Sequence, residues 1–319
     1  MSISSGLPYP GRWNRYSHWL LDRYGSRTAR VSVDGGFSCP NRSPDGTGGC
    51  SFCDFDGSRS PVLGSARDIA EQVDRAAAFQ RARYGAGVLL LYFQAFSSTN
   101  APAARLREIY DAALARAPFR GLIVATRPDC LDSEKAGLLA SYRDRGLDVW
   151  VELGLQSSRD ETLDRIRRGH SAADFAEARN LLRRLKIPVS AHAVFGLPGE
   201  TEADMLGTIR FLADLGIEGI KIHDLHIPAG CGLYQEALAG ELVLFSPQRH
   251  LDLCVRALEL LPADTLIQRL TTDTPADRRA LPRRAVDKAG FLRALDRELE
   301  ARDTWQGRLY GAGGNRSLV

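Results

Sequence analysis

Three cysteines, Cys39, Cys50 and Cys53, lie in a stretch rich in glycine, proline and polar residues, "CPNRSPDGTGGCSFC". Cys50 and Cys53 are spaced to ligate one metal ion or neighbouring irons of one cluster, and Cys39 supplies a third thiolate. A structural zinc site needs a fourth ligand, usually from a second cysteine pair or a histidine pair, and no such pair stands at a suitable spacing. An electron-transfer ferredoxin also needs four thiolates. Three thiols therefore favour a 4Fe-4S cluster with one iron open to a further ligand, and a zinc ion with a distant fourth ligand is the alternative.

The composition is that of a globular chain in a reducing compartment. The 319 residues are 44% hydrophobic and carry a net charge of +3. No apolar run approaches the roughly 20 residues of a membrane span, and the N-terminus has no signal-peptide pattern. The other cysteines, Cys130, Cys231 and Cys254, are scattered, unlike those of a disulfide scaffold. We therefore expect a soluble, cytoplasmic protein that does not associate with membranes.

Apolar, β-branched runs predict the strands that must position the cysteines. Six such runs end at Val33, Phe93, Thr126, Leu155, Gly196 and Ile227. Near-continuous hydrophobic runs are typical of strands covered on both faces. Amphipathic stretches at 65–84, 103–116, 133–145, 172–185 and 202–215, with an extra helical turn at 160–168, lie between them. Alternating β and α units predict a parallel sheet that curves partly or wholly into a barrel.

The carboxyl ends of these strands are polar and rich in glycine, as in "FQAFSSTN", "ELGLQS" and "FGLPGE". Catalytic and ligand-binding residues of parallel α/β sheets lie at the carboxyl ends of the strands, and the cysteine stretch follows the first strand. We therefore expect the cysteines at the mouth of the barrel. Three segments are predicted: an N-terminal helical segment (1–27) covering an end of the barrel, the barrel (28–227), and a C-terminal extension (228–319) with a strand-like "TLIQRL" and a basic helix.

The C-terminal extension is the most basic part of the chain. Residues 278–316 contain ten basic and five acidic side chains, a net charge of +5. In one interpretation this is a solvated helix whose arginines pair with nearby acids, such as Arg293 with Asp296 and Arg297 with Glu300. In the other, the basic side chains bring an RNA backbone to the barrel mouth.

Several motifs, in order along nearly the whole chain, carry a resemblance to a known family. They include "DGGFSCPNR", "GTGGCSFC", "ATRPDCL", "VELGLQS", "RRGH", "FGLPGET" and "KIHDLHI". The sequence resembles the radical S-adenosylmethionine (SAM) superfamily, and within it the YhcC/YtqA-type proteins, relatives of the Elongator catalytic-subunit radical SAM domain. The cysteine spacing, ten residues and then two, differs from the commonest spacing of the superfamily and fits this family, whose first loop is long.

The resemblance implies a fold and a chemistry. The fold is an α/β protein, a partial (β/α)6 TIM-like barrel of the radical SAM type with a C-terminal extension. Cys39, Cys50 and Cys53 would hold a 4Fe-4S cluster whose electron cleaves SAM to methionine and a 5′-deoxyadenosyl radical. A reductant protein of the flavodoxin or ferredoxin type would supply the electron. The cofactors carry the difficult chemistry, while the protein orients them and excludes water.

Roles in SAM binding follow from the same resemblance. Phe52, between two cluster ligands, is expected to pack on the cluster or the adenine. The backbone from Gln94 to Ser97 is expected to bind the SAM amino group. Arg168, in the "RRGH" motif, is expected to form a bidentate pair with the SAM carboxylate.

Two further strand ends are assigned to SAM. Glu152 would accept hydrogen bonds from the ribose or the ammonium group, and Gln156 lies at the end of the same strand; a satisfied polar pair is the alternative for these two residues. Val194 and Gly196 belong to a glycine-proline turn that lets the backbone approach the adenine closely.

Candidates for catalysis are fewer. Cys130 is placed to relay a hydrogen atom or to ligate a second cluster, with a small buried residue as the alternative. His223 follows the sixth strand at the mouth. Asn100, Cys231 and Arg284 depart from the residues that relatives carry at these positions, which leaves the substrate open.

Three functions are compatible with these residues. The first is a radical SAM enzyme that modifies RNA, most plausibly a tRNA base, with the basic C-terminal segment as the RNA contact. The second is a radical SAM enzyme that acts on a small metabolite or cofactor precursor. The third is a non-catalytic iron-sulfur protein that binds a partner or senses redox state. The salt dependence of RNA binding distinguishes the first from the second.

Overall fold

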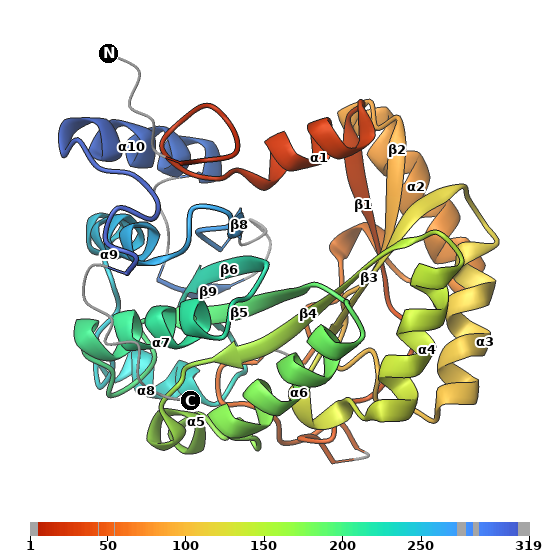
Figure 1. Cartoon of the computed structure of the whole chain (residues 1–319). Coiled ribbons are helices and arrows are strands. Elements are labelled where there is room, and N and C mark those ends of the chain that lie inside the picture. Colours follow the sequence, from red (N-terminus) through yellow and green to blue (C-terminus); the bar gives the residue numbers. More distant parts are fainter. Residues whose placement is uncertain (1–5, 44, 54, 273–278, 283–286, 312–319) are drawn as a thin grey trace.

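The computed structural model describes residues 6–43, 45–53, 55–272, 279–282 and 287–311. At its centre a parallel sheet of seven strands, in the order β1-β2-β3-β4-β5-β6-β8, curves into an open half-barrel (Figure 1). The strands are β1 (Thr28–Val33), β2 (Val88–Phe93), β3 (Phe119–Thr126), β4 (Asp148–Gln156), β5 (Val189–Phe195), β6 (Gly219–Asp224) and β8 (Leu266–Arg269). The predicted α/β partial barrel is confirmed.

The seventh strand, β8, comes from the strand-like segment of the C-terminal extension, whereas the sequence predicted six strands in the barrel. It pairs in parallel with β6. Its sequence signal is weak because the strand is only four residues long. The C-terminal extension therefore contributes to the sheet itself, while the predicted boundary at residue 228 stays a prediction.

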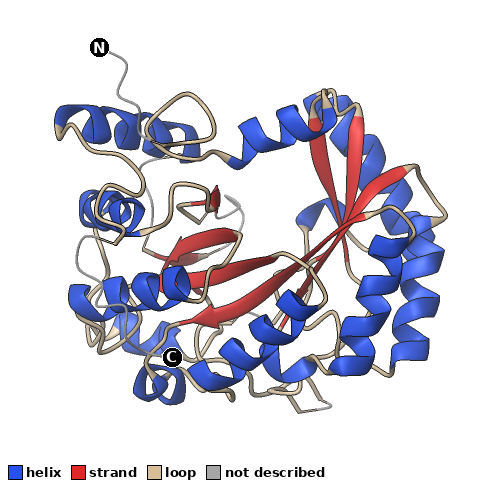
Figure 2. Ribbon diagram, in the orientation of Figure 1, coloured by secondary structure: helices blue, strands red, loops and turns tan. Residues whose placement is uncertain are grey.

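Helices cover the outer face of the sheet (Figure 2). They are α2 (Ile69–Tyr84), α3 (Ala103–Leu114), α4 (Ser133–Asp144), α6 (Ala172–Arg184) and α7 (Glu202–Asp214), with α5 (Asp160–Arg165) as the predicted extra turn. Capping side chains fix where several of them begin. Asp68 caps α2, and Ser171 and Thr201 form capping boxes with the acidic residue three positions later.

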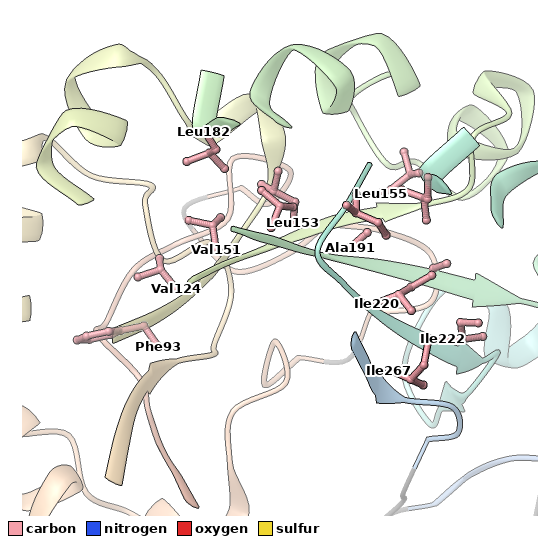
Figure 3. Packing of buried hydrophobic residues seen from close by; sticks show 14 of the residues in the cluster. Phe93, Val124, Val151, Leu153, Leu155, Leu182, Ala191, Ile220, Ile222 and Ile267 are labelled. Atoms are coloured by element: carbon pink, nitrogen blue, oxygen red, sulfur yellow. The ribbon is translucent and has the colours of Figure 1, made fainter. Parts of the chain in front are cut away.

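The outer face of the sheet is apolar. Alternate side chains of each strand point to this face, because successive side chains of a strand point to opposite sides. Figure 3 shows strand residues such as Val151, Leu153 and Ile220 packed in one cluster with Leu182 of α6. Leu153 and Ile222 have no exposed surface (0%). Burial of this apolar area is the main favourable contribution to folding.

The predicted N-terminal helix is confirmed as α1 (Tyr16–Tyr24), which contacts both β1 and β8 across the open side of the half-barrel (Figure 1). Tyr16 packs in one cluster with inward-facing residues near the amino ends of the strands. The preceding segment is tied to the C-terminal extension: Ile267 N donates to Asn14 O at 2.9 Å, and Asn14 N donates to Gln306 Oε1 at 2.8 Å. The helix thus bridges the two edge strands of the sheet, and the predicted cover over an end of the barrel stays a prediction.

The remaining C-terminal elements pack against the barrel. They are β7 (Ile227–Pro228), α8 (Leu233–Leu238), α9 (Pro247–Leu260), β9 (Ala280–Leu281) and α10 (Lys288–Ala301), and short 3₁₀ helices lie at η1 (Pro61–Leu63) and η2 (Pro128–Cys130). α9 contacts both α7 and α10. Across the described ranges, no helix combines the length and apolar character that a bilayer crossing needs.

Candidate functional site

One large cavity connects the loop that carries Cys39, Cys50 and Cys53 (the cysteine loop) to the inside of the half-barrel. Its volume is about 890 Å³, and all three cysteines line it. Inward-facing side chains of β1, β2, β4, β5, β6 and β8 line it as well. The predicted mouth and the barrel interior are therefore one continuous space, the inner cavity, of a size typical for small-molecule sites.

Backbone hydrogen bonds hold the cysteine loop in place. Ser51 N donates to Ile166 O at 2.9 Å, Leu233 N donates to Ser51 O at 2.8 Å, and Cys53 N donates to Cys50 O at 3.0 Å. The loop is thus anchored between the segment after α5 and the start of α8. The sequence pattern predicted the three cysteines together, and the structure brings all of them to the inner cavity.

Hydrogen-bond donors surround two of the thiols. Arg42 Nη2 donates to Cys53 Sγ at 3.2 Å, and Asn41 Nδ2 donates to Cys50 Sγ at 3.5 Å. Arg168 Nη1 also donates to Cys50 Sγ at 3.5 Å. A metal-bound cysteine is a thiolate, and hydrogen bonds to its sulfur orient and tune such a ligand.

Arg168 is buried and fixed against the strand end. Its Nη2 donates to Gly154 O at 2.7 Å, and Arg127 Nη1 donates to Arg168 O at 2.8 Å. A Cβ at Gly154 would lie 2.5 Å from Arg168 Nη2, so the glycine of "ELGLQS" permits this approach. Within the described residues Arg168 Nε is buried without a hydrogen-bond partner. Arg168 lines the inner cavity.

Other residues assigned to SAM divide into two groups. Phe52, Gln94, Ser97 and Gln156 line the inner cavity. Gln156 adopts a left-handed conformation (φ 81°) at a register shift in β4, which turns the end of this strand.

Val194 and Gly196 do not line the inner cavity. Val194 packs in a separate apolar cluster with Phe52 at its edge, and Gly196 lies beside Phe245. Their assignment to the adenine stays a prediction.

The residues at the mouth fit a 4Fe-4S cluster with SAM. Two of the three thiols, Cys50 and Cys53, receive hydrogen bonds, and the guanidinium of Arg168 lies beside Cys50. Ser97 is fully buried, and its Oγ meets no partner of good hydrogen-bond geometry among the described residues.

Glu152 lies deeper in the half-barrel and has four partners among the protein side chains. Arg30 Nη1 donates to Oε1 at 2.8 Å. Tyr92 OH, His192 Nε2 and Lys221 Nζ approach Oε2 at 2.6, 3.0 and 2.5 Å, respectively. These five residues form the Glu152 network. Both carboxylate oxygens are thus engaged, which resembles the satisfied polar alternative, and the expected role of Glu152 in SAM binding stays a prediction.

Burial and charge shift the pKa values in this network. Burial opposes ionisation of Glu152, but Lys221 and Arg30 outweigh it and hold the pKa of the carboxyl well below its usual value. Burial lowers the pKa of Lys221 to about 7, although Glu152 acts in the opposite direction. Burial also lowers the pKa of His192 to about 4 and that of His223 well below its usual value, the latter with help from Arg269.

The two catalytic candidates occupy different places. His223 lines the inner cavity, with its ring 5.4 Å from that of His192. Cys130 is buried (4% exposed) in η2 and does not line the inner cavity. Burial raises the pKa of its thiol to about 11, and nearby Asp129 acts in the same direction, so the thiolate is disfavoured.

Several residues of the barrel interior were not predicted from the sequence, above all Arg30, Tyr92, Lys221 and Arg269. Lys221 and His223 alternate with apolar residues in "GIKIHD", and Glu152 interrupts "VWVELGL". A period of two was therefore present in these runs, and it could have indicated a polar inner face.

The basic segment is described only in part. Arg278, Arg283, Arg284 and Arg316 lie outside the described residues. The predicted pairs of Arg293 with Asp296 and of Arg297 with Glu300 are not formed.

Asp296 instead accepts hydrogen bonds from Arg15 and from Trp13 Nε1. Arg293 and Arg297 are exposed and have no ion-pair partner in the described parts of the chain. Arg302, by contrast, pairs with Glu298 and Asp252.

Two family models match most of the chain. The family model described as the Radical SAM superfamily matches residues 40–212, and that of the Radical SAM C-terminal domain matches residues 217–301. The uncharacterized protein YtqA of Bacillus subtilis (strain 168) is 35% identical over 316 residues, covering 97% of each chain. Protein YhcC of Escherichia coli (strain K12) is 42% identical over 234 residues, 72% of this chain and 73% of that protein.

Among solved structures, the archaeal Methanocaldococcus infernus Elp3 with an N-terminal deletion aligns with a TM-score of 0.69. The alignment covers 91% of this chain and 68% of that one at 19% sequence identity. This likeness concerns the fold alone.

Proposed function

Because the chain belongs to the Radical SAM superfamily, we propose that Cys39, Cys50 and Cys53 hold its 4Fe-4S cluster and that the inner cavity binds SAM together with a substrate. The protein is a radical SAM enzyme, and its family uses a 4Fe-4S cluster and SAM. When bound, these cofactors supply an electron that cleaves SAM to methionine and a 5′-deoxyadenosyl radical, which removes a hydrogen atom from a substrate. The non-catalytic alternative is not proposed further.

The chain's own residues have distinct tasks in this proposal. Arg42 and Asn41 stabilise the cluster thiolates through their hydrogen bonds to sulfur. Arg168, which lines the inner cavity beside Cys50, binds the SAM carboxylate through its guanidinium. Ser97 and Gln156 offer polar groups to SAM from the cavity wall. Enclosure of these groups strengthens each polar contact and limits side reactions with water.

The continuity of the inner cavity carries the proposal for the substrate. The cysteine loop and the Glu152 network line the same space of about 890 Å³, so a molecule bound in the half-barrel lies next to the cluster site. A small metabolite or cofactor precursor can enter such a space entirely. We therefore favour the small-molecule function over RNA modification.

The first test is release of 5′-deoxyadenosine by anaerobically reconstituted, dithionite-reduced protein supplied with SAM. Cys50→Ala is expected to lose the cluster absorbance and all SAM cleavage. Cys254→Ala is the matched control, because Cys254 is buried in the core on α9, away from the inner cavity. A Cys50→Ala variant that keeps a full 4Fe-4S spectrum and turnover would contradict the assignment.

RNA modification is the second candidate, and the exposed, unpaired Arg293 and Arg297 on α10 favour it. If these side chains bind phosphates, the double change Arg293→Gln/Arg297→Gln weakens tRNA binding and reduces its salt dependence. The matched control is Arg105→Gln/Arg107→Gln on α3, which removes the same charge from another exposed helix. Equal tRNA affinities of both double variants and the wild type would remove this candidate.

Enzymes of this superfamily need a reductant. We propose a flavodoxin or ferredoxin type of donor, supported by the cysteine loop, where Cys39 and Cys53 are only partly buried and Phe55 is 77% exposed. A cytoplasmic location stays a prediction.

A further inference from the structure

The wall of the inner cavity is strongly basic. Among the described residues that line it, Glu152 is the only acid. The lining Lys and Arg residues are Arg27, Arg30, Arg42, Arg127, Arg168, Lys221, Arg269 and Lys288. Some of these charges are exposed or paired, as Arg127 is with Asp129. Inside the half-barrel, Arg30 and Lys221 share the single carboxylate of Glu152, and a charge without a partner there is costly, which favours a ligand of opposite charge.

Strand register gathers three of the basic side chains in one row. His192 on β5 is the register partner of Lys221 on β6, and Lys221 is the register partner of Arg269 on β8. Directly opposite residues in neighbouring strands have side chains close enough to interact with one ligand. The row lies on the inner face, because all three residues line the inner cavity.

A β-bulge places Arg269 in this row. The register between β6 and β8 shifts at this point: Ile267 pairs with Ile220, and Arg269 pairs with Lys221. Gln268 is the extra residue, and its Oε1 accepts a hydrogen bond from Arg30 Nη2 at 2.7 Å. Both Gln268 and Arg269 therefore line the cavity, although neighbours in a regular strand point to opposite faces.

Arg269 differs from the other cations of the barrel interior because no anion balances it. Arg30 and Lys221 both share the carboxylate of Glu152. Within the described residues Arg269 makes no ion pair or hydrogen bond. Its charge also lowers the pKa values of Lys221 and His223, because Arg269 repels positive charge on these two neighbours.

We propose that the substrate carries a carboxylate or phosphate group that binds between Arg269 and Lys221, with His192 and His223 beside it. This proposal rests on the function proposed above and assigns the substrate to the class of small organic anions. An arginine fork matches the geometry of either group, and an ammonium at its side adds a second charged donor. The Glu152 network then positions Lys221, and the rest of the substrate extends towards the cysteine loop.

The test uses the few lysines of the chain. The sequence contains only four, Lys135, Lys186, Lys221 and Lys288, and Lys221 alone is buried. Protein with ¹³C at the lysine ε-carbons should therefore give a resolved Lys221 signal whose chemical shift reports its charge. The signal is assigned by its loss in Lys221→Met. Measurements use the reconstituted holoprotein with saturating SAM, so that the site of the SAM carboxylate is filled.

Two probes separate the possible anions: inorganic phosphate and the tricarboxylate tricarballylate. Binding of either probe is expected to favour the charged amine of Lys221 and so to raise the pH midpoint of its signal by about one unit. Such a shift corresponds to about tenfold tighter binding of the anion to the charged than to the neutral amine. Affinity should fall as pH rises through this midpoint. The charged and titratable groups that face Lys221 in the described structure are Arg30, Tyr92, Glu152, His192, His223 and Arg269.

Variants of Arg269 make the test specific. Arg269→Gln should weaken the better probe about tenfold or more, whereas Arg269→Lys should retain part of the affinity. Arg293→Gln, which removes an exposed charge on α10, should bind like the wild type. The anion site would be overturned if neither probe, at tens of millimolar, shifted the Lys221 signal. It would also be overturned if Arg269→Gln and the wild type bound the better probe with equal affinity.

Failure of this site and failure of the proposed function are separable. SAM cleavage by the wild-type protein without added substrate is measured on the same samples through release of 5′-deoxyadenosine. Cleavage without anion binding would overturn only the anion site. Anion binding that depends on Arg269 supports the site even if no cleavage occurs, and that combination would contradict the radical function.

Discussion

The two faces of the half-barrel sheet have opposite chemistry although the same seven strands build both. On β4, Leu153 points outwards into the apolar core, while Glu152 points inwards and binds four polar side chains. On β6, Ile222 packs on the outer face, and Lys221 and His223 line the inner cavity. Apolar burial on the outer face contributes most of the free energy of folding, whereas holding charged groups on the inner face for a ligand costs part of it.

The inner face is the more sensitive to loss of one partner. In Glu152→Ala, Lys221 and Arg30 lose their only shared carboxylate while remaining inside the barrel. We expect a loss of about 3–5 kcal/mol in the free energy of unfolding, the usual cost of leaving a buried charge unpaired. Urea denaturation under anaerobic conditions measures it. Glu152→Gln, which keeps the size and one acceptor, should lose less, and an unchanged midpoint in both variants would refute the importance of the network.

The adjacent outer residue provides the comparison. Leu153→Ala removes a side chain with 0% exposure and leaves a cavity in the apolar core. We expect a loss of about 3 kcal/mol, within the usual range for such truncations. The Lys221 titration should stay as in the wild type, because the charges lie on the other face. A shifted Lys221 midpoint in this variant would show that the two faces are coupled.

The pH dependence of stability distinguishes the faces as well. The native pKa of Lys221 is about 7, below the value near 10.4 expected for an unfolded lysine. Between these values the unfolded chain binds the extra proton, so Lys221 makes stability rise with pH by up to about 1.4 kcal/mol per unit. Lys221→Met should flatten the rise between pH 7 and 9 in urea denaturation, whereas Lys186→Met, at an exposed position, should not. Equal slopes in all three proteins would contradict the depressed pKa.

The smallest effect is expected for Cys130, which lies in η2 and on neither face of the sheet. Cys130→Ala should keep about four irons per chain and lose at most about 1 kcal/mol of stability, because the thiol is buried outside the inner cavity. Iron analysis and cluster absorbance check this. A fall of the iron content by about half would reveal a second cluster at Cys130.

The sequence predicted the outer face better than the inner one. Runs such as "VLLLYF" and "GLIVAT" are long and apolar, so the strands and the helices between them could be placed closely. The three cysteines could be grouped because their types and spacing suffice for a ligand set. These features depend on residues that are near one another in the sequence.

The barrel interior depends on contacts that local sequence does not encode. Lys221 and Glu152 meet across strands, 69 positions apart. β8 has only four residues, and its bulge, which places Arg269 in the cavity, has no glycine or proline to mark it. The polar inner face could therefore be anticipated only from the alternation within β4 and β6, and its partners required the structure.

The contacts between the N-terminal segment and the β8 region limit when folding of the half-barrel can be completed. Arg15 forms a β-bridge with Ile267, and Asn14 is bonded to Gln306 and to Asp264 O. For the two contacts of Asn14, the N-terminal partner leaves the ribosome 250 and 292 residues before the other. Contacts at such separation form late in folding. The half-barrel can therefore be completed only after nearly all the described chain has been made.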